Sequence, residues 1–395
     1  MFAGHHHEPS ICFVGLANLS VLAREYGHVG VGGAEVQQTL LAKALARRGY
    51  EVSMVVADYG QPDGASWDGV TTWRAYNLAA GLPLVRFIHP RWTAVWSALK
   101  RADADVYYVS GAGMLLGLVT MFARQYGRKV IFRVASTSDC DPVTLRVKFW
   151  RDKRLYAYGL KRADVVLAQT GEQQRKLFEC YGRDSRIAAS LAEDGGRCPP
   201  FDERDIDVLW VGSFRPLKRP QLLLDLARKL PELRFVMAGG PYPDHADLFE
   251  DIGRQAAGLA NVEFRGAIPY HEVHNLYERA RLLVGTSEIE GFPNTYLQAW
   301  THGAPVVAYL DPENLIAQKG LGRVVTTPDE MASAVNAVLA AESEWSDASA
   351  RSRTYAAARL DENTMLAPYI EAIGTLGNDG SARNETTTSA ARAAR

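Results

Sequence analysis

Residues 287–309 read SEIEGFPNTYLQAWTHGAPVVAY and combine an acidic turn with the start of a helix. A short apolar run leads into Glu290 and Gly291, a helical stretch follows, and Gly303 ends that stretch before a new apolar run. The first N–H groups of a helix have no partner within the helix, so they are available to a phosphate. The pattern therefore predicts a phosphate site with the Glu290 carboxylate at its mouth.

A second loop adds positive charge. In DVLWVGSFRPLKRP, residues 207–220, an apolar strand is followed by Gly212, Arg215 and Lys218. The carboxyl ends of parallel strands meet at one edge of a sheet, so this loop and the Glu290 loop are expected to face the same cleft. Two cations beside free N–H groups would suit a diphosphate.

A glycine cluster near the amino end offers a third phosphate-binding segment. Gly27, Gly30, Gly32 and Gly33 lie between a predicted strand and a predicted helix. The cluster is not a dinucleotide fingerprint, because the third glycine would fall on Glu35. The sequence also contains no G-x-x-x-x-G-K-[ST], which argues against a P-loop kinase or ATPase.

No metal site is expected. His271 and His274 lie one residue too close together for a zincin motif, and the Asp103–Asp105 pair is interpreted as a solvated helix end. The four cysteines form no C-x-x-C pair and are interpreted as reduced cytosolic thiols.

Strand-like and helix-like segments alternate along most of the chain, which predicts a doubly wound α/β fold. The strands expected in the first half are 11–17, 51–56, 70–75, 105–109, 129–134 and 165–168, with helices at 34–48, 93–101, 114–126, 143–161 and 172–180. The strands expected in the second half are 206–211, 234–238, 262–264, 281–285 and 305–309, with helices at 220–230, 247–258, 271–279, 295–302, 329–341 and 347–374.

The alternation stops once, in a stretch rich in Gly, Pro and charge, which predicts a linker. We therefore expect two tandem Rossmann-like domains that face a cleft, followed by a helical segment and a disordered tail. The expected boundaries are 1–190 for the amino-terminal, acceptor-side domain, 191–204 for the linker, 205–376 for the donor domain with its carboxyl-terminal helices, and 377–395 for the tail.

Composition excludes some classes of protein. Lys plus Arg number 44 and Asp plus Glu 45, a formal net charge of −1, whereas a generic nucleic-acid binder is usually strongly basic. No apolar run reaches the length of a membrane-spanning helix, and a cytoplasmic location is expected. The His5–His7 tract is interpreted as a flexible tail or an expression remnant.

In combination, these segments resemble family 4 glycosyltransferases of the GT-B fold, over about residues 11–375. GVGGAEVQQTLLAKALARRGYEV resembles the family's glycine loop and first helix, VGSFRPLKRPQLLLDLARKLPELRFVMAGG its donor-side strand, basic pair and helix, and EGFPNTYLQAWTHGAPVV its E-x₇-E region. The resemblance implies a retaining, hexosyltransferase-type enzyme that uses a nucleotide sugar, with UDP expected and GDP next.

The donor side departs from the family pattern at three positions. The second acidic position is Gln298, whose amide can still donate to and accept from ribose hydroxyls. The residue three after Glu290 is Pro293, which has no N–H, so the backbone of Phe292, Asn294 and Thr295 would serve the phosphate. Ser213 stands where the family often has Arg, and Arg215 is expected to compensate.

The amino-terminal domain departs as well. The family's active-site His has no match in RVASTSDCDP, where Arg133, Ser136, Asp139 and Asp141 are the acceptor-side candidates. Asp139 is the first choice for a catalytic role, and a simple helix-entry turn is the alternative interpretation.

By resemblance, the Glu290 carboxylate holds the hydroxyls of the donor sugar and favours its oxocarbenium-like state, while Lys218 and Arg215 stabilise the leaving diphosphate without a metal. The alternative role of Glu290 is to cap the next helix. The expected donor-binding set is Gly32, Gly33, Ser213, Arg215, Gly291, Phe292, Asn294, Thr295 and Gln298.

The expected acceptor is a saccharide, a glycolipid or a lipid-linked sugar in polysaccharide or cell-surface glycan synthesis. Residues 84–101 and 146–162 mix basic and aromatic side chains, which suits peripheral contact with the inner face of a membrane. A solvated helix face with its aromatics in the core explains them equally well. A GT-B sugar-nucleotide epimerase and a non-catalytic nucleotide-sugar-binding protein are the competing functions.

Overall fold

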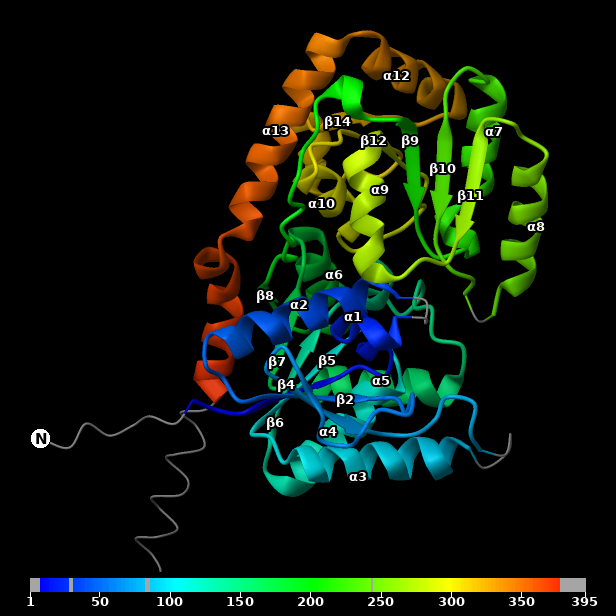
Figure 1. Cartoon of the computed structure of the whole chain (residues 1–395). Coiled ribbons are helices and arrows are strands. Elements are labelled where there is room, and N and C mark those ends of the chain that lie inside the picture. The colour runs from blue at the N-terminus through cyan, green and yellow to red at the C-terminus, as the bar shows by residue number, and fades with distance from the viewer. Residues whose placement is uncertain (1–7, 28–30, 82–85, 243, 377–395) are drawn as a thin grey trace, which may run out of the picture.

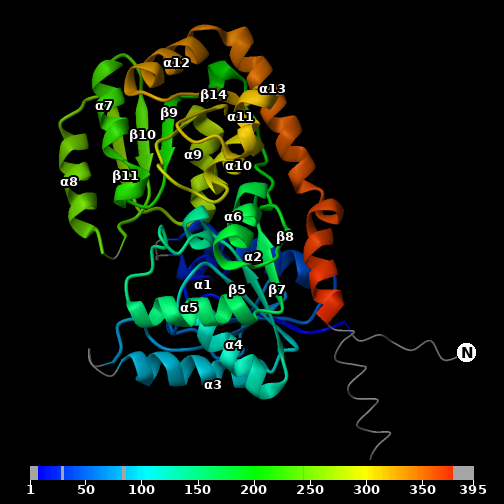
Figure 2. The ribbon, with the colours of Figure 1, turned by 180° about the vertical axis from the view of Figure 1, so that it is seen from behind.

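Two α/β lobes lie one above the other in the computed structural model, which describes residues 8–27, 31–81, 86–242 and 244–376 (Figures 1 and 2). The His5–His7 tract, Gly30 and the 377–395 tail lie outside the described residues. The first lobe contains the amino-terminal sheet and the second lobe contains the carboxyl-terminal sheet. The expected pair of α/β domains is therefore confirmed.

The first domain is built on an eight-stranded sheet in the order β3-β4-β2-β1-β5-β6-β7-β8. All neighbouring strands are parallel except β3 and β4. The strands are β1 Ile11–Val14, β2 Val52–Val56, β3 Ser66–Trp67, β4 Val70–Arg74, β5 Val106–Ser110, β6 Lys129–Arg133, β7 Val165–Ala168 and β8 Arg186–Ile187. The strands β1, β2 and β7 are buried throughout because helices cover both faces of the sheet.

The second domain has a six-stranded, all-parallel sheet in the order β11-β10-β9-β12-β13-β14. Its strands are β9 Ile206–Val211, β10 Phe235–Ala238, β11 Val262–Gly266, β12 Ala280–Gly285, β13 Val306–Ala308 and β14 Gly322–Val324. Because β9 and β12 are neighbours, the loops that follow them emerge side by side, and these loops carry Lys218 and Glu290.

The helices follow the predicted alternation, with short additions. They are α1 Leu19–Leu22, α2 Gly33–Arg47, α3 Thr93–Ala102, α4 Met114–Tyr126, α5 Trp150–Arg162, α6 Gly171–Tyr181, α7 Gln221–Lys229, α8 Ala246–Ala257, α9 Val273–Arg279, α10 Asn294–Thr301, α11 Leu315–Lys319, α12 Pro328–Ala340 and α13 Glu342–Leu360. One clear difference from the expected bounds is at α5, which begins at Trp150 rather than 143.

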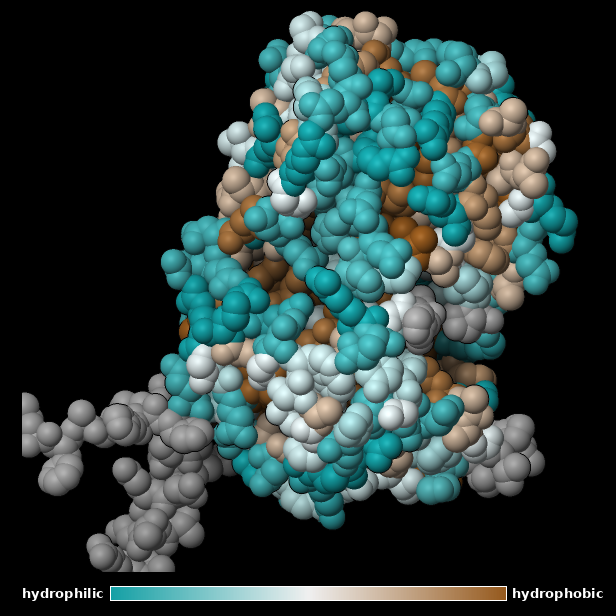
Figure 3. Space-filling model, viewed as in Figure 1, coloured by the Kyte–Doolittle hydropathy of each residue, from teal (hydrophilic) through white to brown (hydrophobic). Residues whose placement is uncertain are grey.

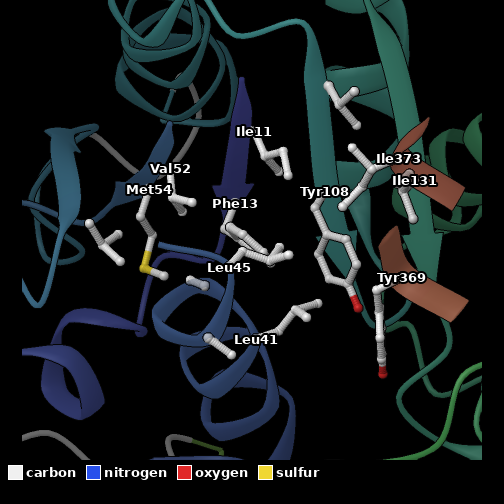
Figure 4. Close-up of a cluster of buried hydrophobic side chains, with 14 of the residues drawn as sticks. Ile11, Phe13, Leu41, Leu45, Val52, Met54, Tyr108, Ile131, Tyr369 and Ile373 are labelled. Atoms are coloured by element: carbon white, nitrogen blue, oxygen red, sulfur yellow. The ribbon is translucent and has the colours of Figure 1, made fainter. Parts of the chain in front are cut away.

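The carboxyl-terminal segment returns to the first domain. The expected single helix at 347–374 is two helices, α13 and a helix over 362–376 with a break at 361, and the second helix lies against the first domain (Figure 1). Tyr369 and Ile373 lie beside Tyr108 and Ile131 in that domain's core (Figure 4). The helix 362–376 thus packs with the first domain, although the sequence grouped it with the second.

The surface in Figure 3 is mostly hydrophilic, with scattered hydrophobic areas. Within the described residues, no helix is both long enough and apolar enough to cross a membrane.

Candidate functional site

Two loops of the second domain are joined by hydrogen bonds at the carboxyl edge of its sheet. The Arg219 Nε donates to Thr286 O at 2.7 Å, and the Thr286 hydroxyl donates to Lys218 O at 2.5 Å. The Glu288 N–H donates to Leu217 O at 2.8 Å. These bonds fix the basic loop after β9 against the acidic loop after β12.

Lys218 and Glu290 meet where these loops join. The Lys218 Nζ contacts the Glu290 Oε1, and the two side chains are only 15% and 16% exposed. Burial lowers the effective dielectric, so each charge acts more strongly here than in water. The pair is a local dipole of a cation and a carboxylate at one edge of the second sheet.

The loop after β10 approaches the loop after β9 closely because Gly239 lacks a side chain. A Cβ on Gly239 would lie 1.8 Å from Gly212 O, and Gly239 has a φ of 149°. Gly212 was expected from the sequence and Gly239 was not, although the AGG at residues 238–240 was a signal for close backbone approach.

The N-terminus of α10 begins at Asn294, directly after the acidic turn. The N–H groups of Asn294 and Thr295 belong to its first turn, where a helix has no internal acceptor. The Phe292 N–H is different, because it donates to Gln169 Oε1 in the first domain at 2.8 Å. Asn294 also crosses between the domains, since its Nδ2 donates to Gly33 O at 2.7 Å.

Gly32 and Gly33 begin α2 in the first domain, as N-cap and first residue. Glu35 folds back over them, and its Oε2 lies 2.5 Å from the place that a Cβ on Gly32 would occupy. Burial raises the pKa of the Glu35 carboxyl, while backbone N–H groups and Arg215 oppose the shift. The two domains therefore bring Glu35 and Arg215 within electrostatic reach of each other, a relationship that the sequence analysis missed.

Arg215 and Ser213 lie between β9 and Lys218. The Arg215 guanidinium lies 5.3 Å from the centre of the Tyr242 ring, and its Nε has no hydrogen-bond partner among the described residues. Ser213 is half-buried next to Gly212. A cation with an unused donor suits an incoming anion.

Gln298 lies one helical turn further along α10 and belongs to a buried polar network. Its Oε1 accepts a bond from the Tyr277 hydroxyl at 3.1 Å, and Tyr270 also bonds to its side chain. The Tyr270 hydroxyl donates to Glu193 in the linker at 2.7 Å. The Gln298 amide is therefore held in one orientation. The network also includes Glu193, a carboxylate that was not expected from the sequence.

Two histidines extend this network. The Glu193 Oε2 lies 3.2 Å from His274 Nε2, and His274 Nδ1 lies 3.2 Å from His302 Nε2. Burial, with His274 beside it, lowers the pKa of His302 to about 4. Hydrogen bonds from His274 and Tyr270 outweigh burial and lower the pKa of Glu193. The network ties the linker to the second domain.

In the first domain, Asp139 lies in a turn whose own side chains and backbone hydrogen-bond to one another. Ser136 and Asp139 form a capping box at the short 3₁₀ helix Thr137–Cys140, and the Asp139 Oδ2 accepts from Ala135 N at 3.1 Å and Ser136 N at 3.2 Å. Burial raises the pKa of Asp139 to about 6, although these N–H groups oppose the shift. The geometry favours the helix-entry interpretation over the catalytic one.

The other acceptor-side candidates, Arg133 and Asp141, have different hydrogen-bond partners. Arg133 is 1% exposed, and its Nη2 donates to Ser190 Oγ at 3.0 Å inside the first domain. Asp141 is half-buried and accepts from Val143 N at 2.8 Å. Arg133 and Asp141 thus have their hydrogen bonds within the first domain, whereas Ala135 O and the Thr137 N–H of this segment contact the Glu290 loop.

The two domains contact each other through the same loops. Besides Phe292–Gln169, the Thr137 N–H donates to Glu290 O at 3.2 Å. The Glu313 carboxylate accepts from Gly171 N at 2.7 Å, at the first residue of α6. Of the predicted donor-binding residues, Gly33, Gly291, Phe292 and Asn294 lie at these contacts between the domains. Among the described residues, no group of three or more His, Cys, Asp or Glu side chains is placed to hold a metal ion.

Two family models match this chain, one in each domain. The family model described as "Glycosyl transferase 4-like domain" matches residues 32–190, and the one described as "Glycosyl transferases group 1" matches residues 205–341. The D-inositol 3-phosphate glycosyltransferase of Mycobacterium tuberculosis is 29% identical over 164 residues, which cover 37% of this chain and 34% of that relative. The match thus spans about a third of that relative's length.

Solved structures with low sequence identity share the fold. Sucrose-phosphate synthase from Thermosynechococcus elongatus is similar with a TM-score of 0.74 and 18% identity, over 95% of this chain and 100% of that chain. HepE of Anabaena, solved in complex with UDP and glucose, has a TM-score of 0.70 and 17% identity, over 93% of this chain and 100% of that chain. These neighbours confirm the expected GT-B architecture.

Proposed function

The chain belongs to the group 1, family 4-like glycosyltransferases, and on that premise we propose that it moves a sugar from a nucleotide sugar to a hydroxyl group of a saccharide, glycolipid or lipid-linked acceptor. The observation that carries the proposal is the Lys218–Glu290 pair, which lies next to the start of α10 and against the first domain. A cation, a carboxylate and free helix N–H groups together suit a sugar diphosphate.

The diphosphate leaving group gains negative charge as its bond to the sugar breaks. In the proposed mechanism, Lys218 and Arg215 and the N–H groups of Asn294 and Thr295 stabilise that charge. Groups fixed before the reaction do this better than water, because they need not reorient in the transition state. We propose that these groups suffice without a metal ion.

The sugar gains positive charge at the same moment. We propose that the Glu290 carboxylate accepts hydrogen bonds from its hydroxyls and favours the oxocarbenium-like state. The contact with Lys218 supports this role, because it holds the carboxylate in one orientation. Retention of configuration at the transferred carbon is proposed from the resemblance to family 4.

We propose a UDP-linked donor, with GDP as the next candidate. The support is that HepE of Anabaena was solved with UDP and glucose and with UDP-glucose. Gln298 is proposed to bind the ribose, in the place of the family's second Glu. Tyr277 and Tyr270 hold its amide, which favours a fixed hydrogen-bonding pattern toward the ribose hydroxyls.

The acceptor is proposed to enter beside residues 135–137, where the first domain touches the Glu290 loop. The roles of Ser136, Asp139 and Asp141 are positional in this proposal. Arg133 is buried inside the first domain and supports that segment from within.

A basic-aromatic surface of the first domain, formed by Phe87, Phe149, Trp150, Arg151 and Arg154, supports a membrane-bound acceptor. The Arg151 guanidinium lies 4.1 Å from the centre of the Phe87 ring and joins two segments far apart in the sequence. Trp150 is 70% exposed, with the Arg154 guanidinium 5.0 Å from its ring. Exposed aromatics among cations suit an anionic lipid surface, so we propose peripheral contact there.

A thermal-shift screen against nucleoside diphosphates and nucleotide sugars tests the proposed function. A ligand at a hundred times its dissociation constant stabilises a protein by about 2.7 kcal/mol, which such a screen detects. We expect uridine nucleotides to raise the melting temperature. Product analysis with the donor alone then separates a transferase from an epimerase, and binding without any transfer would indicate a non-catalytic binding protein.

A further inference from the structure

The side-chain amide of Gln169 lies between the domains with all its hydrogen-bonding positions in use. Gln169 follows β7 in the first domain and is 7% exposed. Its Nε2 donates to Val134 O at 2.7 Å and Ala135 O at 3.1 Å. Its Oε1 accepts the Phe292 N–H of the second domain at 2.8 Å and the Ser190 hydroxyl at 3.5 Å.

The orientation of this amide is set from within the first domain. Gln173 on α6 accepts the main-chain N–H of Gln169 at 2.8 Å, and Thr170 caps that helix through Gln173 N. Ser190, which donates to the amide, is itself bonded by the buried Arg133. A side chain held from three directions cannot turn away without leaving buried polar groups unpaired.

The partner of Gln169 is the turn that carries Glu290. A Cβ on Gly291 would lie 2.4 Å from Ala135 O and 3.0 Å from Gln169 Nε2, so this turn is pressed against the first domain. The neighbouring Glu290 O accepts the Thr137 N–H. Thr137 thus binds the turn at Glu290 itself, and Gln169 binds it two residues later, at Phe292.

We propose that Gln169 is a positioning residue, which uses the first domain to hold the Glu290 turn in the geometry needed for transfer. This inference rests on the proposed function for its catalytic part. It adds that the carboxylate of the second domain is set in place by a side chain of the first domain. It also commits the Phe292 N–H to Gln169, which leaves the N–H groups of Asn294 and Thr295 for the phosphate.

The test compares three variants. Gln169→Met removes the amide but keeps the length of the side chain. Gln174→Met is the matched control, because Gln174 lies on α6 and bonds to Ser185 O within the first domain. Glu313→Ala removes a different contact between the domains, the one to Gly171 N, and leaves the Glu290 turn untouched.

Amide hydrogen exchange of the peptide spanning 287–297 reads out the contact without any substrate. We expect faster exchange there in Gln169→Met than in the other two variants. Unchanged exchange, or the same increase in Glu313→Ala, would overturn the inference. This arm gives a result even if the protein transfers no sugar, so its failure is separate from a failure of the proposed function.

Steady-state kinetics measure the effect of losing the Gln169 amide on sugar transfer. A misplaced carboxylate lowers turnover more than ground-state binding, so we expect kcat of Gln169→Met to fall about 10- to 100-fold. The dissociation constant for UDP is expected to stay within about threefold, since the phosphate contacts remain. A kcat equal to that of Gln174→Met, or a loss no larger than in Glu313→Ala, would contradict the proposal.

Discussion

Lys218 and Glu290 contact each other through Nζ and Oε1, although 72 residues separate them in the sequence. The contact joins the loop after β9 to the loop after β12, and these strands are neighbours in the second sheet. The first domain touches the same acidic turn through Thr137 and Gln169. The turn that carries Glu290 is thus held by both domains at once.

The first prediction concerns Gly291. Gly291→Ala places a methyl group 2.4 Å from Ala135 O, so the domains must separate locally and the Phe292–Gln169 bond is lost. We expect kcat to fall about 10- to 100-fold and the radius of gyration from small-angle scattering to increase. Gly253→Ala is the control, because its nearest atom is an ordinary 3.4 Å away in Phe264. Wild-type scattering and activity in Gly291→Ala would refute the role assigned to this glycine.

The second prediction concerns Gln298. If its amide binds the ribose, Gln298→Ala should weaken UDP binding about fivefold, the value of one hydrogen bond. Binding of 2′-deoxy-UDP should change much less, because part of that contact is already missing. Calorimetry of both ligands measures the difference. Gln255→Ala, an exposed glutamine on α8, is the control, and equal losses for both ligands would argue against ribose recognition.

The third prediction concerns acid stability. The pKa of His302 is lowered from 6.5 to about 4, so the unfolded chain takes up a proton there first as the pH falls. Stability attributed to neutral His302 is complete above pH 6.5 and is lost progressively toward pH 4, by about 3 kcal/mol. Asp139 has the opposite effect on stability. Its pKa is raised to about 6, so the folded state takes up a proton there more readily than the unfolded chain, and acidification stabilises the fold at this residue.

Urea unfolding between pH 7.5 and 4 checks this prediction. The loss of stability on acidification should be smaller in His302→Gln than in the wild type, whatever the variant's stability at pH 7.5. His271→Gln is the control, since that side chain is partly exposed. An identical pH slope in His302→Gln and the wild type would show that another group causes the acid loss.

The fourth prediction concerns the basic-aromatic surface. The wild type should cosediment with anionic vesicles at low salt and be released as salt rises, because salt screens the attraction. Replacing both Trp150 and Arg154 by Ala should weaken that binding. Phe178→Ala is the matched control, since Phe178 is 62% exposed on α6 away from this surface. Absence of any salt-sensitive cosedimentation would rule out the membrane contact.

Much of the fold was predictable because each element carries its own signal. The strands 165–168 and 206–211 and the helix 114–126 were predicted at the bounds that the structure has. The meeting of the Lys218 and Glu290 loops also followed from the sequence, since both loops leave carboxyl ends of strands in one parallel sheet.

The contacts between segments distant in sequence were not predictable. Gln169 is one polar residue after a strand, and only the arrangement of the two domains brings it to Phe292. The helix over 362–376 has an apolar face that fits either domain by pattern alone, and its Tyr369 packs in the first. The network of Glu193 with Tyr270 and His274 likewise depends on where the linker crosses.

Calorimetric titration of the wild type and Lys218→Ala with UDP and UDP-glucose, in the presence of EDTA, tests the central claim most directly. We predict that the wild type binds both ligands and that Lys218→Ala loses about 30-fold or more in affinity, because a charged contact to the diphosphate is removed. Lys229→Ala, which loses an exposed pair with Asp329 in the same domain, should bind like the wild type. Binding by Lys218→Ala equal to the wild type, or no binding of any nucleoside diphosphate by the wild type, would contradict the account.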